Sequence, residues 1–239
     1  MNSARSLTPA FLIAASAFMI ATAADSARAA DDTYLANSHL NPVELLAPPP
    51  LPDSAEQAAD LAEVRAVHAA AAGKDTAAAT MEEKLSVWLF APAIGTYFDA
   101  ARLPKTAAFF KRVQRTTEVF EEEGKTFWKR PRPYVVDPSL ANGKPEKSFS
   151  YPSGHSLRGT VYALVLADLV PDKRDAILAK GREIGWHRVE LARHYPTDIY
   201  AGRVLAQAVV RELKTDPAFQ KDFADAKAEM AAAKTATSN

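Results

Sequence analysis

The spacing of apolar side chains limits the folds open to this 239-residue chain more than any other feature. Apolar or small residues recur every three or four positions in several windows, which places them on one face of an α-helix. No segment alternates apolar and polar residues for long, as a half-buried strand does. The clearest stripes are Phe110, Val113, Thr117 and Phe120; Leu157, Val161, Leu164 and Asp168; and Ile199, Gly202, Ala206, Val209 and Leu213. The sequence therefore predicts an all-α fold, a single compact domain of several packed helices.

Capping residues and prolines predict where helices begin and end. Further helices are expected at about 54–72, 75–90, 172–194 and 216–233. A helix that begins near Thr106 should carry Lys125 close to its end. Because a proline disfavours helical geometry in the residue before it, Pro196 should separate a helix that stops near His194 from the next one. This histidine is then expected at a helix junction.

The first 29 residues are typical of a cleaved export signal. Arg5 supplies a positive charge, residues 7–19 form an apolar run, and Ala27-Arg28-Ala29 offers a cleavage site. An uncleaved membrane anchor is the alternative, although the run is shorter than the roughly 20 residues that span a bilayer. We expect cleavage after Ala29 and a secreted, periplasmic mature protein.

Two segments follow the signal peptide. Residues 30–53 contain Asn41-Pro42, Pro48-Pro49-Pro50 and Pro52, and prolines favour extended or polyproline backbone over helix. We expect this Pro-rich segment to lie over the surface as an arm without a helix. Residues 54–239 should form the helical domain. Beyond residue 30 no apolar run is long enough to cross a bilayer, so the mature protein should be soluble, without stable insertion in a membrane.

Composition excludes several kinds of chemistry. The chain contains no cysteine, which excludes thiolate nucleophiles, cysteine-zinc sites and disulfides. Its 29 Lys and Arg residues balance 29 Asp and Glu residues, and no long basic run occurs. This balance argues against nucleic acid as the main partner. Any anion site must be built from a few local cations.

Three separated groups of residues share one chemical logic. They are Lys125 with Arg132-Pro133; Pro152-Ser153-Gly154-His155; and Arg188 with His194 and Asp198. Together they hold three cations, a turn of small residues, two histidines and a carboxylate. This set suits a tetrahedral oxyanion such as phosphate. Taken alone, the first group could also be a solvated basic stretch, given Lys129 and Arg130 beside it.

The second group marks the start of a helix. Ser153 is a favoured N-cap and an apolar stripe begins at Leu157, so the helix should begin near residues 153–155. Its unpaired N–H groups and positive dipole end would face the space above Ser153 and Gly154, as at many phosphate sites. His155 would lie at the rim of that space. An ordinary capped helix is the alternative for this group alone.

The third group places a charge on an apolar face. Arg188 shares a helix face with Ile184 and Leu191, where a guanidinium is costly to bury unless an anion or a carboxylate pairs with it. Asp198, in the first turn of the next helix, can reach one ring nitrogen of His194. A carboxylate in that position fixes the tautomer and leaves the other nitrogen free to attack. A purely structural pair is the alternative.

Together the groups resemble the signature of the type 2 phosphatidic acid phosphatase (PAP2) superfamily. The matching pattern is Lys125-x6-Arg132-Pro133, then Pro152-Ser153-Gly154-His155, then Arg188-x5-His194-x3-Asp198. Within the superfamily the chain is most similar to the secreted bacterial class A non-specific acid phosphatases, because of its export signal and the leader-like segment 45–50. One departure is His187, where the family usually has a serine. It bears on the hydrogen bonding around Arg188.

The resemblance implies an all-α fold of the PAP2 and haloperoxidase type and a role for each matched residue. His194 would attack phosphorus and form a phosphohistidine, Asp198 would orient it, and His155 would act as general acid and then base. The phosphate oxygens would be bound by Lys125, Arg132, Ser153, Gly154 and Arg188. The implied activity is that of an acid phosphatase that hydrolyses phosphomonoesters and releases inorganic phosphate, without metal or cofactor.

Two other functions are left open. Vanadium-dependent haloperoxidases of the same superfamily use a similar pocket, although they are generally larger. A non-catalytic phosphate-binding protein would also need the cations and the helix N-terminus, but it would not need two histidines. Because members of the family often form dimers or larger assemblies, a homo-oligomer is expected.

Overall fold

The computed structural model of the chain describes residues 33–72, 82 and 84–238. Every regular element in these residues is a helix, which confirms the all-α prediction. The predicted signal peptide lies outside the described residues. The longer helices are α3 (Ala55–Ala71), α6 (Pro104–Trp128), α8 (Gly154–Leu169), α9 (Arg174–Glu190), α10 (Pro196–Thr215) and α11 (Pro217–Ser238). The short elements are α2 (Pro42–Leu45), α5 (Ala91–Ile94) and α7 (Pro133–Val136), with the 3₁₀ helices η1 (Val87–Phe90), η2 (Pro138–Leu140) and η3 (Pro171–Lys173).

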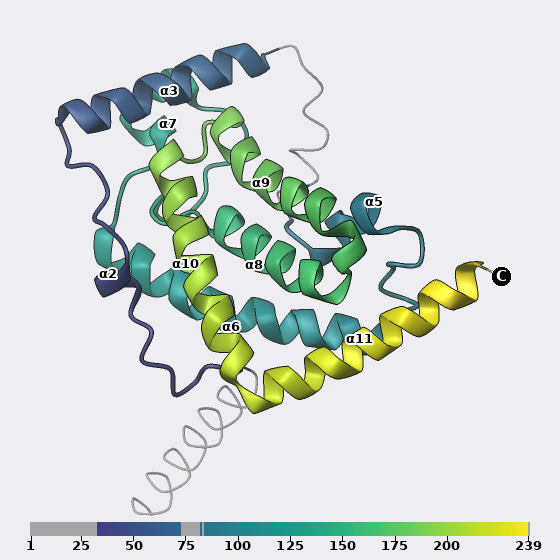
Figure 1. The fold of residues 1–239 in the computed structure, drawn as a ribbon. Helices are drawn as coiled ribbons and strands as arrows, with labels where there is room; N and C mark the ends of the chain where they lie inside the picture. The colour runs from purple at the N-terminus through teal and green to yellow at the C-terminus, as the bar shows by residue number, and fades with distance from the viewer. Residues whose placement is uncertain (1–32, 73–81, 83, 239) are drawn as a thin grey trace, which may run out of the picture.

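Helix α8 lies at the centre of the fold, with α6, α9 and α10 packed around it (Figure 1). Its side chains are buried on every side, and Leu157, Val161 and Leu166 have no exposed surface. A helix that is buried on all its faces needs neighbours all round. Helix α3 packs against α9 and α10 (Figure 1), so it covers the end of the bundle where α10 begins.

Residues 33–53 pack against the helical domain. The ring of Tyr34 lies edge-on to that of Phe219 with 5.4 Å between centroids, and its N–H donates to Oγ1 of Thr116 at 2.9 Å. Contrary to the prediction, this segment contains a helix, α2. The prolines did not prevent it because Pro42 occupies the first helical position, where no N–H partner is needed.

Two predicted helices end elsewhere. In the described part of 75–90, only Val87–Phe90 is helical, as a 3₁₀ helix capped by Ser86, so a long α-helix there was wrong. Helix α9 ends at Glu190, four residues before His194. The cause is Ala192, whose φ of 50° is left-handed and breaks the helix. His194 therefore lies in the turn ahead of α10.

Candidate active site

The N-terminus of α8 is held against the start of α10. Ser153 caps α8 by accepting a hydrogen bond from the N–H of Ser156 at 3.3 Å, as the sequence predicts. The N–H of Ser153 donates to the carbonyl of Asp198 at 3.1 Å. Gly202 permits this approach, because a Cβ atom there would lie 2.8 Å from the carbonyl oxygen of Ser153. A backbone hydrogen bond thus joins the second sequence group, which contains Ser153, to the third, which contains Asp198.

His194 is buried between a carboxylate and a guanidinium. Its Nδ1 lies 3.3 Å from Oδ2 of Asp198, and its Nε2 lies 3.1 Å from Nη1 of Arg132. Because a guanidinium can only donate, Nε2 must accept, which assigns the proton to Nδ1 on the side of the carboxylate. This tautomer leaves a lone pair on Nε2, as a nucleophile requires.

Asp198 has more partners than His194. Its Oδ2 accepts hydrogen bonds from Oγ of Ser150 at 2.6 Å and from the N–H of Tyr195 at 2.9 Å. Its Oδ1 accepts one from Nη1 of Arg130 at 2.6 Å. The side chain has no exposed surface. A carboxylate with this many donors is fixed in orientation, so it can hold the imidazole without moving.

Three cations of the sequence groups lie side by side. Arg132 and Arg188, each with a side chain that is 2% exposed, bind the two oxygens of Glu146. Oγ of Ser148 accepts from Nζ of Lys125 at 3.2 Å and from Nη2 of Arg132 at 3.1 Å. Buried cations in such numbers repel one another unless anions separate them. The arrangement is that of a site for an anion with several oxygens.

Lys125 is also linked to the start of α8. Its Nζ lies 3.1 Å from Oε1 of Glu121, and the Glu121 carboxylate occupies the space that a Cβ of residue 154 would fill. With glycine at this position, the carboxylate can occupy that space without shifting. Gly154 therefore lets α6 bring its lysine close to the N-terminus of α8.

His155 faces the cation cluster from the first turn of α8. Its Nε2 donates to the carbonyl of Glu82 at 3.0 Å, which leaves Nδ1 as the nitrogen that can exchange a proton with a substrate. Burial lowers the pKa of His155 well below 6.5, and the positive charges of Arg188 and Arg158 lower it further. The imidazole is therefore neutral at neutral pH until a negative charge arrives beside it.

Burial has the same effect on His194. It lowers the pKa of this imidazole well below 6.5, and the charges of Arg132 and Lys125 act in the same direction. A neutral imidazole keeps the Nε2 lone pair available over the whole physiological range.

The eight residues that the sequence indicated form one connected group in the structure. They are Lys125, Arg132, Ser153, Gly154, His155, Arg188, His194 and Asp198. Sequence reasoning missed five side chains that touch them: Glu121, Arg130, Glu146, Ser148 and Ser150. Arg130 and Ser150 stand two residues from a motif, a signal that could have been used. Glu146 and Ser148 are ordinary members of a polar loop.

Arg130 corrects one interpretation directly, because it is not a solvated neighbour of Arg132. Its side chain is 3% exposed and bridges two carboxylates, with Nη1 2.6 Å from Asp198 and Nη2 2.7 Å from Asp60 of α3. Thr197 donates to Asp60 as well. The His194–Asp198 pair is thus one end of a buried series of polar contacts that runs from His194 through Asp198 and Arg130 to Asp60 of α3.

Replacing Arg130 by methionine should lower the free energy of unfolding by about 3–5 kcal/mol, the usual cost of removing one partner of a buried ion pair. Asp60 and Asp198 would then face each other without this cation. Urea denaturation at neutral pH measures the change. Arg65→Met is the matched control, because Arg65 pairs with Asp137 at the surface and its loss should change stability little. Equal losses in both variants would contradict this role of Arg130.

His187 takes part in a second cluster, beside His155. Its Nδ1 lies 2.7 Å from Oε2 of Glu82, and the hydrogen bond with this carboxylate raises the pKa of His187. Within the described residues, Glu82, Glu183 and His187 offer ligand atoms within 4.8 Å of one another. Nζ of Lys180 already lies 2.8 Å from Glu82 and 2.9 Å from Glu183, so an ammonium neutralises both carboxylates. His187 contacts the side chain of Glu82, and His155 donates to the backbone carbonyl of the same residue. His187 therefore helps to hold the hydrogen-bond partner of His155 in place.

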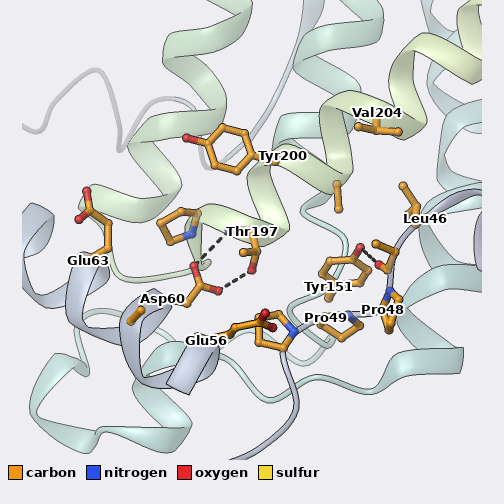
Figure 2. A pocket seen from close by; sticks show the side chains of 15 residues that line it. Leu46, Pro48, Pro49, Glu56, Asp60, Glu63, Tyr151, Thr197, Tyr200 and Val204 are labelled. Atoms are coloured by element: carbon orange, nitrogen blue, oxygen red, sulfur yellow. Dashed lines mark hydrogen bonds between the residues drawn. The ribbon is translucent and has the colours of Figure 1, made fainter. Parts of the chain in front are cut away.

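Asp60 also lines a groove of about 660 Å³. Figure 2 shows Asp60 beside Thr197 at the start of α10, and Tyr151 bonded to the proline-rich segment through the carbonyl of Ala47 at 2.5 Å. Tyr200 and Val204 complete an apolar wall. Neither His155 nor His194 lines this groove, so it is separate from the anion site.

Comparison with known proteins places this site in a family. The family model described as the PAP2 superfamily matches residues 109–220. An acid phosphatase of Zymomonas mobilis is 33% identical over 206 residues, which covers 82% of this chain and 78% of the relative. The chain belongs to the PAP2 superfamily.

Other relatives of this PAP2 chain match over shorter stretches. A non-specific acid phosphatase of Salmonella typhimurium is 31% identical over 149 residues, 59% of each chain. One of Providencia stuartii is 42% identical over 88 residues, which covers 37% of this chain and 36% of the relative. These names confirm the resemblance to non-specific acid phosphatases that the sequence indicated.

Among solved structures, the chain is similar to the first transmembrane PAP2-type phosphatidylglycerolphosphate phosphatase from Bacillus subtilis. The TM-score is 0.47 at 21% identity, with 69% of this chain and 87% of that chain covered. In the described part of this PAP2 chain, no helix combines the length and the apolar character that crossing a bilayer requires.

Proposed function

We propose that the protein is a secreted non-specific acid phosphatase that hydrolyses phosphomonoesters through a phosphohistidine and needs no metal. One observation carries the proposal: the buried guanidinium groups of Arg132 and Arg188 converge on the two oxygens of Glu146, and Arg132 also contacts His194, whose Nε2 is free of a proton. A phosphoryl group in that place would lie in front of a nucleophile. The names of the relatives support phosphatase activity.

In the first step the lone pair on Nε2 of His194 attacks phosphorus as the bond from phosphorus to the ester oxygen breaks. His155 gives a proton to the leaving oxygen, and Asp198 stabilises the positive imidazole. The charge that develops on the equatorial oxygens is bound by Lys125, Arg132 and Arg188, with Ser153 and the N–H of Gly154. These three cations supply the positive charge that a metal provides in other phosphatases.

In the second step water attacks phosphorus of the phosphohistidine and transfers a proton to His155. The phosphorus–nitrogen bond breaks, inorganic phosphate leaves, and both histidines regain their starting forms. Because the pKa of His155 lies below its ordinary value, the proton for the leaving group is present at acidic pH and is lost as pH rises. The dianionic substrate shifts this pKa upward, but activity should still favour acidic solutions.

A panel of phosphomonoesters measured against pH, with and without EDTA, tests the proposal. We expect hydrolysis of several substrates, a decline toward alkaline pH, and the same rate in the chelator. Acid-labile, base-stable phosphate should be trapped on the protein during turnover. Rates that vanish in EDTA and return with Mg²⁺ or Zn²⁺ would contradict metal independence. Phosphate binding without hydrolysis would indicate a binding protein, and bromide oxidation with vanadate and peroxide a haloperoxidase.

Secretion to the periplasm is part of the proposal and rests on the export signal alone. Cleavage after Ala29 would leave Ala30 as the first residue. N-terminal sequencing of the protein recovered from the periplasm tests this directly. An intact N-terminus in the membrane fraction would indicate the uncleaved anchor instead.

A further inference from the structure

The carboxylate of Glu146 bridges two of the three cations of the site. Its Oε1 lies 2.5 Å from Nη2 of Arg188, and its Oε2 lies 2.7 Å from Nη2 of Arg132. Both guanidinium groups are buried, whereas the Glu146 side chain is 29% exposed. One acidic side chain therefore closes the cluster from the solvent side, with one oxygen for each arginine.

The contacts of Glu146 are those that the proposed mechanism gives to phosphate. A phosphoryl group also presents oxygens to two guanidinium groups, and each Nη2 is already bonded to a glutamate oxygen. A substrate that binds Arg132 and Arg188 in this way must take the place of the carboxylate. Two anions cannot share these donors, because their negative charges repel at such short distances.

Arg188 depends on this carboxylate more than Arg132 does. Arg132 also donates to the carbonyl oxygens of Ser148 at 2.8 Å and Arg193 at 2.9 Å. Nε and Nη1 of Arg188 are buried and have no hydrogen-bond partner among the described residues. If Glu146 leaves, another anion has to compensate Arg188, and a phosphate with its additional oxygens can reach the donors that glutamate does not use.

Glu146 is placed so that it can leave without disturbing the core. It belongs to the segment 141–149 after η2, which contains no helix and is mostly exposed. Its own N–H donates to the hydroxyl of Tyr134 at 3.0 Å, so the backbone is tethered while the side chain reaches inward. Rotation about side-chain bonds is enough to move the carboxylate into solvent.

We propose that Glu146 is an affinity-determining residue: an internal anion that every phosphate ligand must displace from Arg132 and Arg188. This inference rests on the phosphate site proposed above. The displacement weakens binding of substrate and of inorganic phosphate by the same factor, because both replace the same carboxylate. It thereby also assists release of the product, since the glutamate returns to the arginines as phosphate departs.

Calorimetric titration with inorganic phosphate tests the inference without requiring catalysis. In Glu146→Gln the dissociation constant of phosphate should fall about tenfold or more, because a neutral amide carries no charge to compensate the arginines and its single oxygen can accept from only one of them. The inhibition constant of phosphate in the hydrolysis assay should fall by the same factor. Glu123→Gln is the matched control, an exposed glutamate on α6 whose loss removes the same charge and should leave the constant unchanged.

A second variant guards against a folding defect in the first. Glu146→Asp keeps the charge but shortens the side chain, so it cannot hold both arginines, and it should also tighten phosphate binding. Unchanged or weaker binding in the folded variants would overturn the inference, as would a wild-type protein and variants that bind no phosphate. If phosphate binds more tightly in both variants but no variant hydrolyses a phosphomonoester, the proposed function fails while the role of Glu146 stands.

Discussion

Replacing His194 by alanine is expected to lower kcat by a factor on the order of 10⁴ or more, the scale found when a catalytic nucleophile is removed. The covalent route is lost altogether, because among the described residues no other side chain is held between Asp198 and Arg132 as this imidazole is. Substrate should still bind, so the loss falls on kcat rather than KM. Steady-state hydrolysis of p-nitrophenyl phosphate measures both constants.

Two comparisons make this result specific. His39→Ala removes an exposed histidine outside the site and should leave kcat unchanged. His187→Ser restores the residue that is usual in the family and should cost far less than His194→Ala. Trapped phosphate should disappear from the His194 variant. Turnover close to that of the wild type in this variant would contradict its role as nucleophile.

Replacing His155 by alanine should lower kcat by about 10²–10⁴ for alkyl phosphates, the range expected for loss of general acid and base catalysis. A p-nitrophenolate leaving group needs little protonation, so its phosphate ester should lose less in the first step. Rates measured over a series of leaving groups should therefore become more dependent on leaving-group basicity in the variant than in the wild type.

The second step provides an independent measurement on the same variant. Without His155 no base accepts the proton from water, so phosphohistidine should accumulate when a good leaving group allows it to form. Rapid quenching would detect more protein-bound phosphate than in the wild type. An equal loss for all leaving groups, with no accumulation, would assign His155 to phosphate binding rather than to proton transfer.

The sequence predicted those helices that have both an apolar stripe and a residue that marks the helix start. Ser153 began α8 and Pro196 began α10 as expected, because each acts through local backbone chemistry. The predicted helix at 75–90 was wrong in its described part, since helix propensity there competes with burial of Val87 and Phe90 in the core. Local sequence could not report that tertiary contact.

The site was predictable where several residues form a spaced motif and unpredictable where a single residue arrives from a distant segment. Arg188 was recognised because a charge on an apolar face demands a partner, but nothing in the sequence identified Glu146 as that partner. Asp60 is a similar case: it stands in an amphipathic helix like any surface acid, and only packing of α3 against α10 buries it. Pairs of charged residues that lie far apart in the sequence can be identified only once the fold is known.

The chain of ion pairs from α3 to His194 bears on how a minimal functional unit should be chosen. The region that matches the family model begins at residue 109, whereas Asp60 lies well before it. An excised fragment that starts at that boundary would retain every motif side chain yet leave Arg130 with one anionic neighbour in place of two. Truncations made for expression should therefore keep α3, because the motif residues alone do not complete the electrostatic framework behind the imidazole.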